Sequence, residues 1–112
     1  MGDRANIKIQ SDGNSELYFY THWNAYKLPK TLQDALKRKL RWNDESYLNR
    51  IIFCEMVKDV ENRETGFGIS TVLCDGSDRI ITVNPDKNTV EIQGKVWTFN
   101  EYIECDVEKI QF

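Results

Sequence analysis

The chain has 112 residues, 40% hydrophobic and 29% charged, which is enough for a single domain spanning residues 1–112 with its own core. No apolar run exceeds four residues, as in Ile51–Cys54. The sequence therefore predicts neither a membrane span nor a secretory signal, and we expect a cytoplasmic protein. The net charge of −3 argues against general nucleic-acid binding, although residues 1–42 are basic and residues 43–112 acidic, an asymmetry that could steer a partner.

The first two predicted elements are strands joined by a tight turn. Residues 5–10 alternate apolar and polar side chains, and so do residues 16–23. Asp12-Gly13 between them has hairpin-turn chemistry because glycine tolerates a positive φ. One face of the second strand is aliphatic, and the other carries aromatic side chains with polar tips and the only histidine of the chain.

Two helices are predicted next. Over residues 28–40 a leucine recurs every four residues, and Thr31 with Asp34 resembles a capping box. Residues 44–60 form the second helix, with Asp44 as a candidate N-cap. Apolar side chains surround most of this helix, so we expect it to be the central core helix or a dimer interface, and we expect a homodimer.

The C-terminal half is predicted to be mainly β-structure. Gly94 is expected to form a bulge or bend, and Asn100 to cap a short helical turn. Strands are expected over residues 67–73, 79–83, 89–99 and, more briefly, 107–112. The order ββ-αα-βββ predicts an α+β domain with two helices packed on a largely antiparallel sheet.

The three cysteines, Cys54, Cys74 and Cys105, are odd in number and have no metal-ligand spacing. We expect reduced thiols rather than a disulfide framework. Cys54 lies in the most apolar part of the second helix, where burial would disfavour a thiolate. A single histidine excludes a multi-histidine zinc site, and we expect neither a metal nor a cofactor.

Residues 18–26 are the leading candidate site. Aromatic side chains with polar tips combine a large contact area with hydrogen bonds, whereas a core would favour leucine, isoleucine or phenylalanine over three tyrosines. The pattern indicates a surface for a small polar ligand, such as a nucleotide, or for a protein partner. The candidate residues are Tyr18, Tyr20, His22, Trp23 and Tyr26.

Residues 63–70 hold a second candidate. Gly66 and Gly68 would let backbone N–H groups approach a ligand, and Arg63 could pair with an anion. A strand start relieved by glycines gives the same pattern. Arg50 is a further cation that could converge on the same concavity.

His22 has several interpretations. It could be a structural histidine at a strand end, the partner of a nucleophilic cysteine, or a general acid or base. Glu55 is a carboxylate on an apolar helix surface, where such a group is paired or has a shifted pKa. Its candidate partners are His22, Arg50 and Lys58.

Four segments together resemble a family of small bacterial and phage-borne proteins that has no established activity. They are "LYFYTHWNAYKLPKTLQDAL", "RWNDESYLNRIIFCEMV", "ETGFGIST" and "VWTFNEYI". Shared features are a Tyr-x-His-Trp strand end, a Leu-Pro helix start and a Thr-Gly-x-Gly-Ile strand, and the likeness spans residues 6–104. The resemblance implies a small cytosolic accessory protein. The chain departs from it at Asn24, where a small or acidic residue is expected. Asn24 cannot ionise, and this weakens a metal site further.

The sequence favours a small non-enzymatic protein that sequesters a polar, nucleotide-like ligand or blocks a partner protein. In a phage setting such a protein would serve as a counter-defence inhibitor. Two other classes remain open: a small enzyme that uses His22 as general acid or base, and a dimeric assembly protein. An enzyme requires His22 close to a polar partner in a concavity, whereas an assembly protein requires a flat apolar patch.

Overall fold

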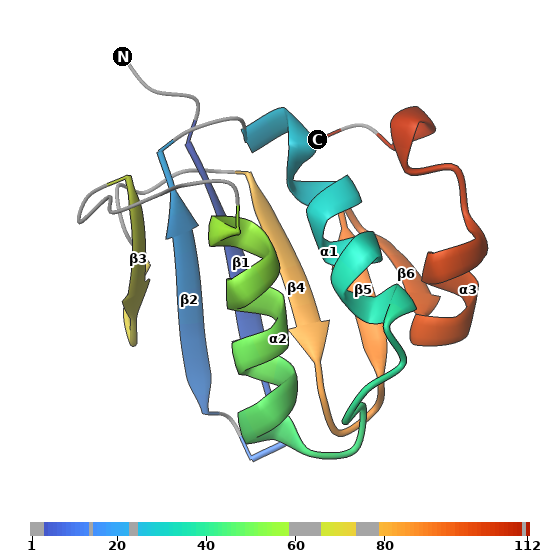
Figure 1. The fold of residues 1–112 in the computed structure, drawn as a ribbon, viewed down its shortest axis with the longest axis horizontal. Helices are drawn as coiled ribbons and strands as arrows, with labels where there is room; N and C mark the ends of the chain where they lie inside the picture. The colour runs from blue at the N-terminus through green and yellow to red at the C-terminus, as the bar shows by residue number, and fades with distance from the viewer. Residues whose placement is uncertain (1–3, 14, 23–24, 59–65, 74–78, 111) are drawn as a thin grey trace.

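The computed structural model describes residues 4–13, 15–22, 25–58, 66–73, 79–110 and 112. Within them, six strands form one sheet and three α-helices pack beside it, which is an α+β fold (Figure 1). In sheet order the strands are β3 (Phe67–Ser70), β2 (Glu16–Thr21), β1 (Ala5–Gln10), β4 (Ile80–Asn84), β5 (Thr89–Ile92) and β6 (Lys95–Thr98). The helices are α1 (Leu28–Lys37), α2 (Glu45–Val57) and α3 (Phe99–Glu104).

The sheet is mixed because of one pairing. β1 and β2 form the predicted antiparallel hairpin around Asp12-Gly13, whereas β1 pairs with β4 in parallel, with Ile7 opposite Ile81. The other three pairings are antiparallel. The alternation of side chains along a strand specifies its buried face but not the direction of its neighbour, so the sequence did not reveal the parallel pair.

The predicted order ββ-αα-βββ is wrong, and the chain runs ββ-αα-ββββ-α. The segment expected to be one strand over residues 89–99 is the β5–β6 hairpin. At its turn, Gln93 has φ +53° and Gly94 has φ +82°. Two consecutive positive φ angles make a two-residue turn whose twist matches that of the flanking strands. Gly94 is therefore a hairpin-turn residue rather than a bulge.

The C-terminal segment also differs from the prediction. Thr98, not Asn100, caps α3: its Oγ1 accepts from the Glu101 backbone N–H at 3.1 Å, and Glu101 Oε1 accepts from the Thr98 N–H at 2.9 Å. This reciprocal capping box makes the helix begin at Phe99. The strand predicted over 107–112 is absent from the described residues there, where Val107–Lys109 form a 3-10 turn instead.

The first two helices begin near the predicted positions but are stabilised differently. α1 begins at Leu28, with Pro29 in its first turn, so Thr31 and Asp34 lie inside the helix rather than forming a capping box. Asp44 is at the N-cap position of α2, but its side chain makes no capping hydrogen bond. The predicted burial of α2 on most sides is wrong: its buried residues are Leu48, Ile52, Glu55 and Met56.

Because α2 is buried along one stripe, Cys54 is exposed rather than buried. Cys54 and Cys105 are both free thiols, as predicted, and Cys74 lies outside the described residues.

Glu55 is the buried carboxylate of the helix layer, with a side chain only 3% exposed. Arg38 Nη2 from α1 lies 2.6 Å from its Oε1, and Lys58 forms a second ion pair with it. Two cations compensate the cost of burying the carboxylate, and the pair with Arg38 ties α1 to α2. Lys58 was among the expected partners of Glu55, but Arg38 was not.

The two faces of the sheet are covered differently. In Figure 1, α1 and α2 lie over one face of the sheet. Ile7 and Ile9 of β1 belong to the hydrophobic core on this face. The alternate residues Lys8 of β1 and Tyr18 of β2 point to the opposite face, which no helix of the described part of the chain covers. Within the same residues, no helix is long and apolar enough to cross a lipid bilayer.

Candidate functional site

The polar aromatics of β2 gather on the sheet face away from α1 and α2. Tyr20 Oη lies 3.0 Å from His22 Nδ1, and Arg4 Nε donates to the same nitrogen at 3.1 Å. A guanidinium can only donate, so Nδ1 of His22 must carry the lone pair and accept from both groups. His22 is thus a hydrogen-bonded histidine at a strand end, which fits its structural interpretation.

Tyr18 is on the same face and is also engaged by its neighbours. Its hydroxyl donates to Glu16 Oε1 at 2.8 Å, and the Lys8 ammonium lies 6.0 Å from its ring centre. The hydrogen bond to the Glu16 carboxylate, together with burial, raises the pKa of the Tyr18 phenol. The tyrosine tips of β2 are therefore committed to contacts within the protein.

The structure brings together only some of the residues predicted for the site. Gly66 has φ +95°, and its carbonyl accepts from the His22 N–H at 2.8 Å; Gly68 is opposite Tyr20 in the register. Gly66 and Gly68 therefore lie beside the β2 aromatics.

The other predicted site residues lie apart from them. Arg50 lies on α2, beyond the other face of the sheet. Tyr26 is in the 3-10 turn Ala25–Lys27 and is 62% exposed. Trp23 and Arg63 lie outside the described residues.

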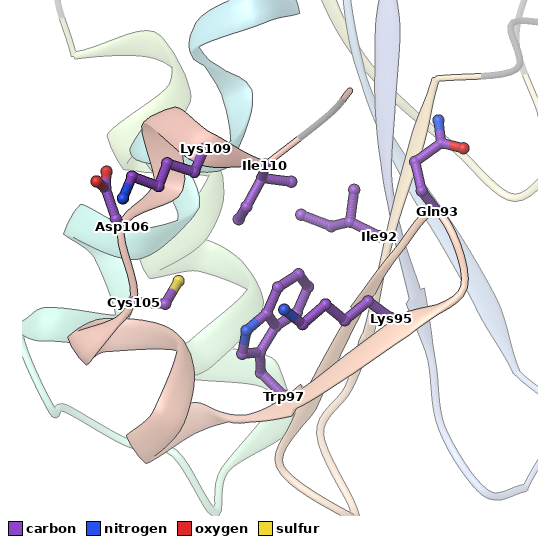
Figure 2. Close-up of a pocket in the computed structure, with 8 residues that line it drawn as sticks. All are labelled: Ile92, Gln93, Lys95, Trp97, Cys105, Asp106, Lys109 and Ile110. Carbon is purple, nitrogen blue, oxygen red and sulfur yellow. The ribbon is translucent and has the colours of Figure 1, made fainter.

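A pocket of about 390 Å³ lies elsewhere, between the β5–β6 hairpin and the segment that follows α3 (Figure 2). Its volume falls at the lower end of the range of roughly 300–1,000 Å³ that is typical of small-molecule sites. We call it the Trp97 pocket. It is lined by Ile92, Gln93, Lys95, Trp97, Cys105, Asp106, Lys109 and Ile110.

The wall of the Trp97 pocket is apolar. Trp97 is only 8% exposed and packs edge-on against Tyr102, with ring centres 5.6 Å apart. Ile92 from β5 and Ile110 from the C-terminal segment point toward one another across the opening in Figure 2. This arrangement gives a ligand a flat, dry surface for van der Waals contact.

Charged groups stand at the rim of the same pocket. The Lys95 ammonium lies over the Trp97 indole, 5.2 Å from the ring centre. Lys109 and Asp106 lie on the opposite side of the pocket, where the Lys109 side chain extends toward Asp106 in Figure 2. Two ammonium groups against one carboxylate leave the rim with a net positive charge, which favours an anionic group on the ligand.

Cys105 is the thiol of the Trp97 pocket. Burial raises the pKa of this thiol. A backbone hydrogen bond and the Lys95 charge lower it by less, and the Asp106 charge makes the smallest contribution, which raises it. The thiolate is the nucleophilic form of cysteine, so Cys105 is kept in its less reactive form at neutral pH. The raised pKa therefore argues against Cys105 as a nucleophile in this pocket.

The wall after α3 is held in place by Gln33 of α1. Its amide Nε2 donates to the carbonyl of Cys105 at 2.8 Å and to those of Tyr102 and Ile103 at 3.1 and 3.4 Å. The Tyr102 hydroxyl donates to the Pro29 carbonyl at 2.7 Å. The Gln33 amide thus provides a donor for carbonyls at the end of α3, and the Tyr102 hydroxyl ties α3 to the first turn of α1, so that the pocket wall is held in place before any ligand arrives.

A second concavity, of about 280 Å³, lies between α2 and strands β2 and β3. We call it the β3 groove. Phe19 and Phe53 meet there with ring centres 5.4 Å apart, and Arg50 is its only charged lining residue. The complete lining is Leu17, Phe19, Asn49, Arg50, Phe53, Cys54 and Ile69.

Neither concavity resembles a metal site, since the described residues contain no group of three or more His, Cys, Asp or Glu side chains that could hold a metal ion. Comparisons with protein-family models, with curated proteins and with solved structures gave no match. The resemblance to a phage-borne family therefore stays an expectation.

Sequence reasoning missed the Trp97 pocket because its two walls are distant in the chain. The alternation Lys95-x-Trp97 was visible as a strand pattern, and it could have indicated a lysine beside an indole. Nothing local shows that Lys109 and Ile110 fold back against them. The pairing of those segments depends on Gln33 and Tyr102, which act across the molecule.

Proposed function

We propose that the chain is a binding protein that acts by occupancy, holding a small anionic ligand with a flat ring in the Trp97 pocket. The observation that carries the proposal is the coincidence, in one preformed cavity, of a buried indole with two lysine side chains. This keeps the nucleotide-like ligand class expected from the sequence and moves its site from the β2 aromatics to the C-terminal pocket.

The shape of the pocket sets the size of the ligand. At about 390 Å³ it accommodates a single ring system with a few substituents rather than a dinucleotide. The ring would pack against Trp97, Ile92 and Ile110, where apolar contact and stacking contribute most of the affinity. Its acidic group would meet Lys95 and Lys109 at the rim.

An enzymatic function has less support. His22 and Glu55, one candidate acid–base pair, each have other partners: His22 accepts from Arg4, and Glu55 is neutralised by Arg38 and Lys58. The thiol of Cys105 has a raised pKa. A ligand in the Trp97 pocket would therefore be held rather than converted, as in sequestration.

A thermal-shift screen against nucleoside monophosphates, cyclic mononucleotides and aromatic carboxylic acids tests the proposal. A ligand at one hundred times its dissociation constant adds about 2.7 kcal/mol to the free energy of unfolding. The variant Lys95→Gln/Lys109→Gln should lose this stabilisation. The matched variant Lys27→Gln/Lys37→Gln, with two exposed lysines on other elements, should keep it.

The location of the ligand can be read from Cys105. In a Cys54→Ser/Cys74→Ser background, a bound ligand should slow the alkylation of Cys105, because this side chain lines the pocket. A ligand that stabilises both lysine variants equally, or that leaves the alkylation rate of Cys105 unchanged, binds elsewhere and refutes the proposed site.

A further inference from the structure

We propose that the outer edge of β3, together with the β3 groove, binds an extended acidic–apolar segment of a partner protein, which adds to the sheet as a further strand. This interaction surface is separate from the Trp97 pocket and does not depend on the proposed ligand. It would give the protein a way to occupy a partner while the pocket holds a small molecule.

The register of β2 and β3 shows which backbone groups face outward. The N–H of His22 donates to the carbonyl of Gly66, so these two residues form a hydrogen-bonded antiparallel pair. Hydrogen-bonded pairs recur every second residue along an antiparallel ladder, so Tyr20 and Gly68 also form a hydrogen-bonded pair. Phe67 and Ile69 therefore turn their N–H and C=O groups to the outer edge.

That edge is open within the described residues. β3 is at the end of the sheet, and no described residue hydrogen-bonds to the outward groups of Phe67 or Ile69. Proteins usually protect a terminal strand with a lysine, a proline or a bulge. The four residues of β3, Phe-Gly-Ile-Ser, contain neither lysine nor proline.

The β3 groove adds a side-chain site to this backbone site. Ile69 is 56% exposed and is paired with Phe19, so its side chain lies on the face toward α2, where Phe53 also lines the cavity. Side chains of an added strand alternate between the two faces of the sheet. One apolar side chain of the incoming strand would thus pack over Ile69 toward Phe53.

Charge selects the partner. Arg50 is the only charged residue lining the groove, it is exposed, and no described residue forms an ion pair with it. A carboxylate on the incoming strand would supply that ion pair. A second copy of this chain paired through β3 would bring a second Arg50 instead, so an acidic partner fits better than a homodimer.

Selection of random octapeptides displayed on phage, with counter-selection on the Ile69→Lys variant, tests the surface. A lysine on the edge strand blocks strand addition, and the exposure of Ile69 makes the substitution tolerable for folding, which thermal unfolding verifies. We expect enriched peptides to alternate apolar and polar residues and to contain an acidic residue.

Synthetic versions of the enriched peptides then separate backbone from charge contacts. N-methylation at a single residue that faces β3 should weaken binding by about 3–10-fold, whereas the same change at the next residue should have little effect. The variant Arg50→Glu should weaken binding of the acidic peptide and strengthen binding of its lysine-substituted form. Lys37→Glu, an exposed charge reversal on α1, serves as the control.

Three results would overturn the proposal: no peptide that distinguishes the wild type from Ile69→Lys, equal binding by both N-methylated peptides, or no effect of Arg50→Glu. A concentration-dependent dimer that Ile69→Lys disrupts, without peptide binding, would assign the edge to a second copy. Peptide binding that survives in Lys95→Gln/Lys109→Gln separates this surface from the Trp97 pocket, whatever becomes of the ligand.

Discussion

The two edges of the sheet differ in how they are covered and stabilised. At the β6 edge, a two-residue turn closes the hairpin, Thr98 caps α3, and Gln33 holds the carbonyls where that helix ends. The β3 edge pairs only with β2, and Phe67 and Ile69 face outward with unpaired backbone groups in the described part of the chain.

The difference relates rigidity to the kind of ligand each edge can hold. A small molecule offers few contacts, so its site must be ordered in advance or the cost of ordering consumes the affinity. An extended peptide brings its own row of hydrogen-bonding groups and can bind to a short strand with one adjoining groove. The Trp97 pocket satisfies the first requirement and the β3 edge the second.

The largest effect expected from this comparison concerns the aromatic anchor at each edge. Trp97→Ala should lower the free energy of unfolding by about 3–5 kcal/mol, because the ring is buried against Tyr102. Phe53→Ala should cost less, because Phe53 is only partly buried beside the β3 groove. Urea midpoints of the two variants measure the difference, and equal losses would show that the β3 edge is as well packed as the β6 edge.

A smaller loss is expected when the hydrogen bonds behind the Trp97 pocket are removed. Gln33→Leu keeps a similar volume but removes the donor shared by three carbonyls, which should cost about 1–3 kcal/mol. The substitution should also accelerate alkylation of Cys105, because Gln33 holds in place the segment of the pocket wall that contains this cysteine. Unchanged stability and unchanged alkylation together would mean that Gln33 does not order the pocket. Lys37→Leu, an exposed change on the same helix, controls for the added leucine.

The alkylation rates of the two described cysteines measure how accessible and reactive a thiol is at each edge. Cys54 is exposed in the β3 groove, whereas Cys105 lines the Trp97 pocket with a raised pKa. In a Cys74→Ser background at pH 8, iodoacetamide should alkylate Cys54 at least roughly tenfold faster than Cys105, because the thiolate is the reactive species. The ratio of the two alkylation rates should fall as the pH rises and Cys105 ionises. Faster reaction at Cys105 at pH 8 would contradict the closed character of the β6 edge.

The smallest expected effect is that of Ile69→Thr on stability. Ile69 is on an open edge and is more than half exposed, so the free energy of unfolding should change by no more than about 0.5 kcal/mol. A loss well above this, measured by urea denaturation, would indicate that the edge is covered by the chain itself.

The N-terminal half was the more predictable part of the fold. Alternation around Ile7 and Phe19, with Asp12-Gly13 between, predicted the β1–β2 hairpin, because those signals are local. The leucine repeat likewise predicted α1. The split at Gln93-Gly94 was missed because the alternation continues through the turn, and Thr98 was missed as a cap because it also continues a strand pattern.

The candidate site was less predictable than the fold. Composition singled out Tyr18, Tyr20 and His22, and the structure does place them on one face, but their polar atoms bond to Glu16, to Arg4 and to one another. Composition cannot distinguish a tyrosine whose hydroxyl is available to a ligand from one whose hydroxyl is hydrogen-bonded to a neighbouring residue. The lining of the Trp97 pocket has no unusual local pattern.

By itself, the sequence determined the secondary structure of most of the chain, the α+β class and the free state of the two described cysteines, because these follow from side-chain periodicity and spacing. Only the tertiary structure decided the parallel pairing of β1 with β4, the pairing of Glu55 with Arg38, and the return of residues 105–110 against the β5–β6 hairpin. Each of these joins residues far apart in the sequence. Such contacts form only where the whole fold offsets the entropy of closing the intervening chain, so no local pattern encodes them.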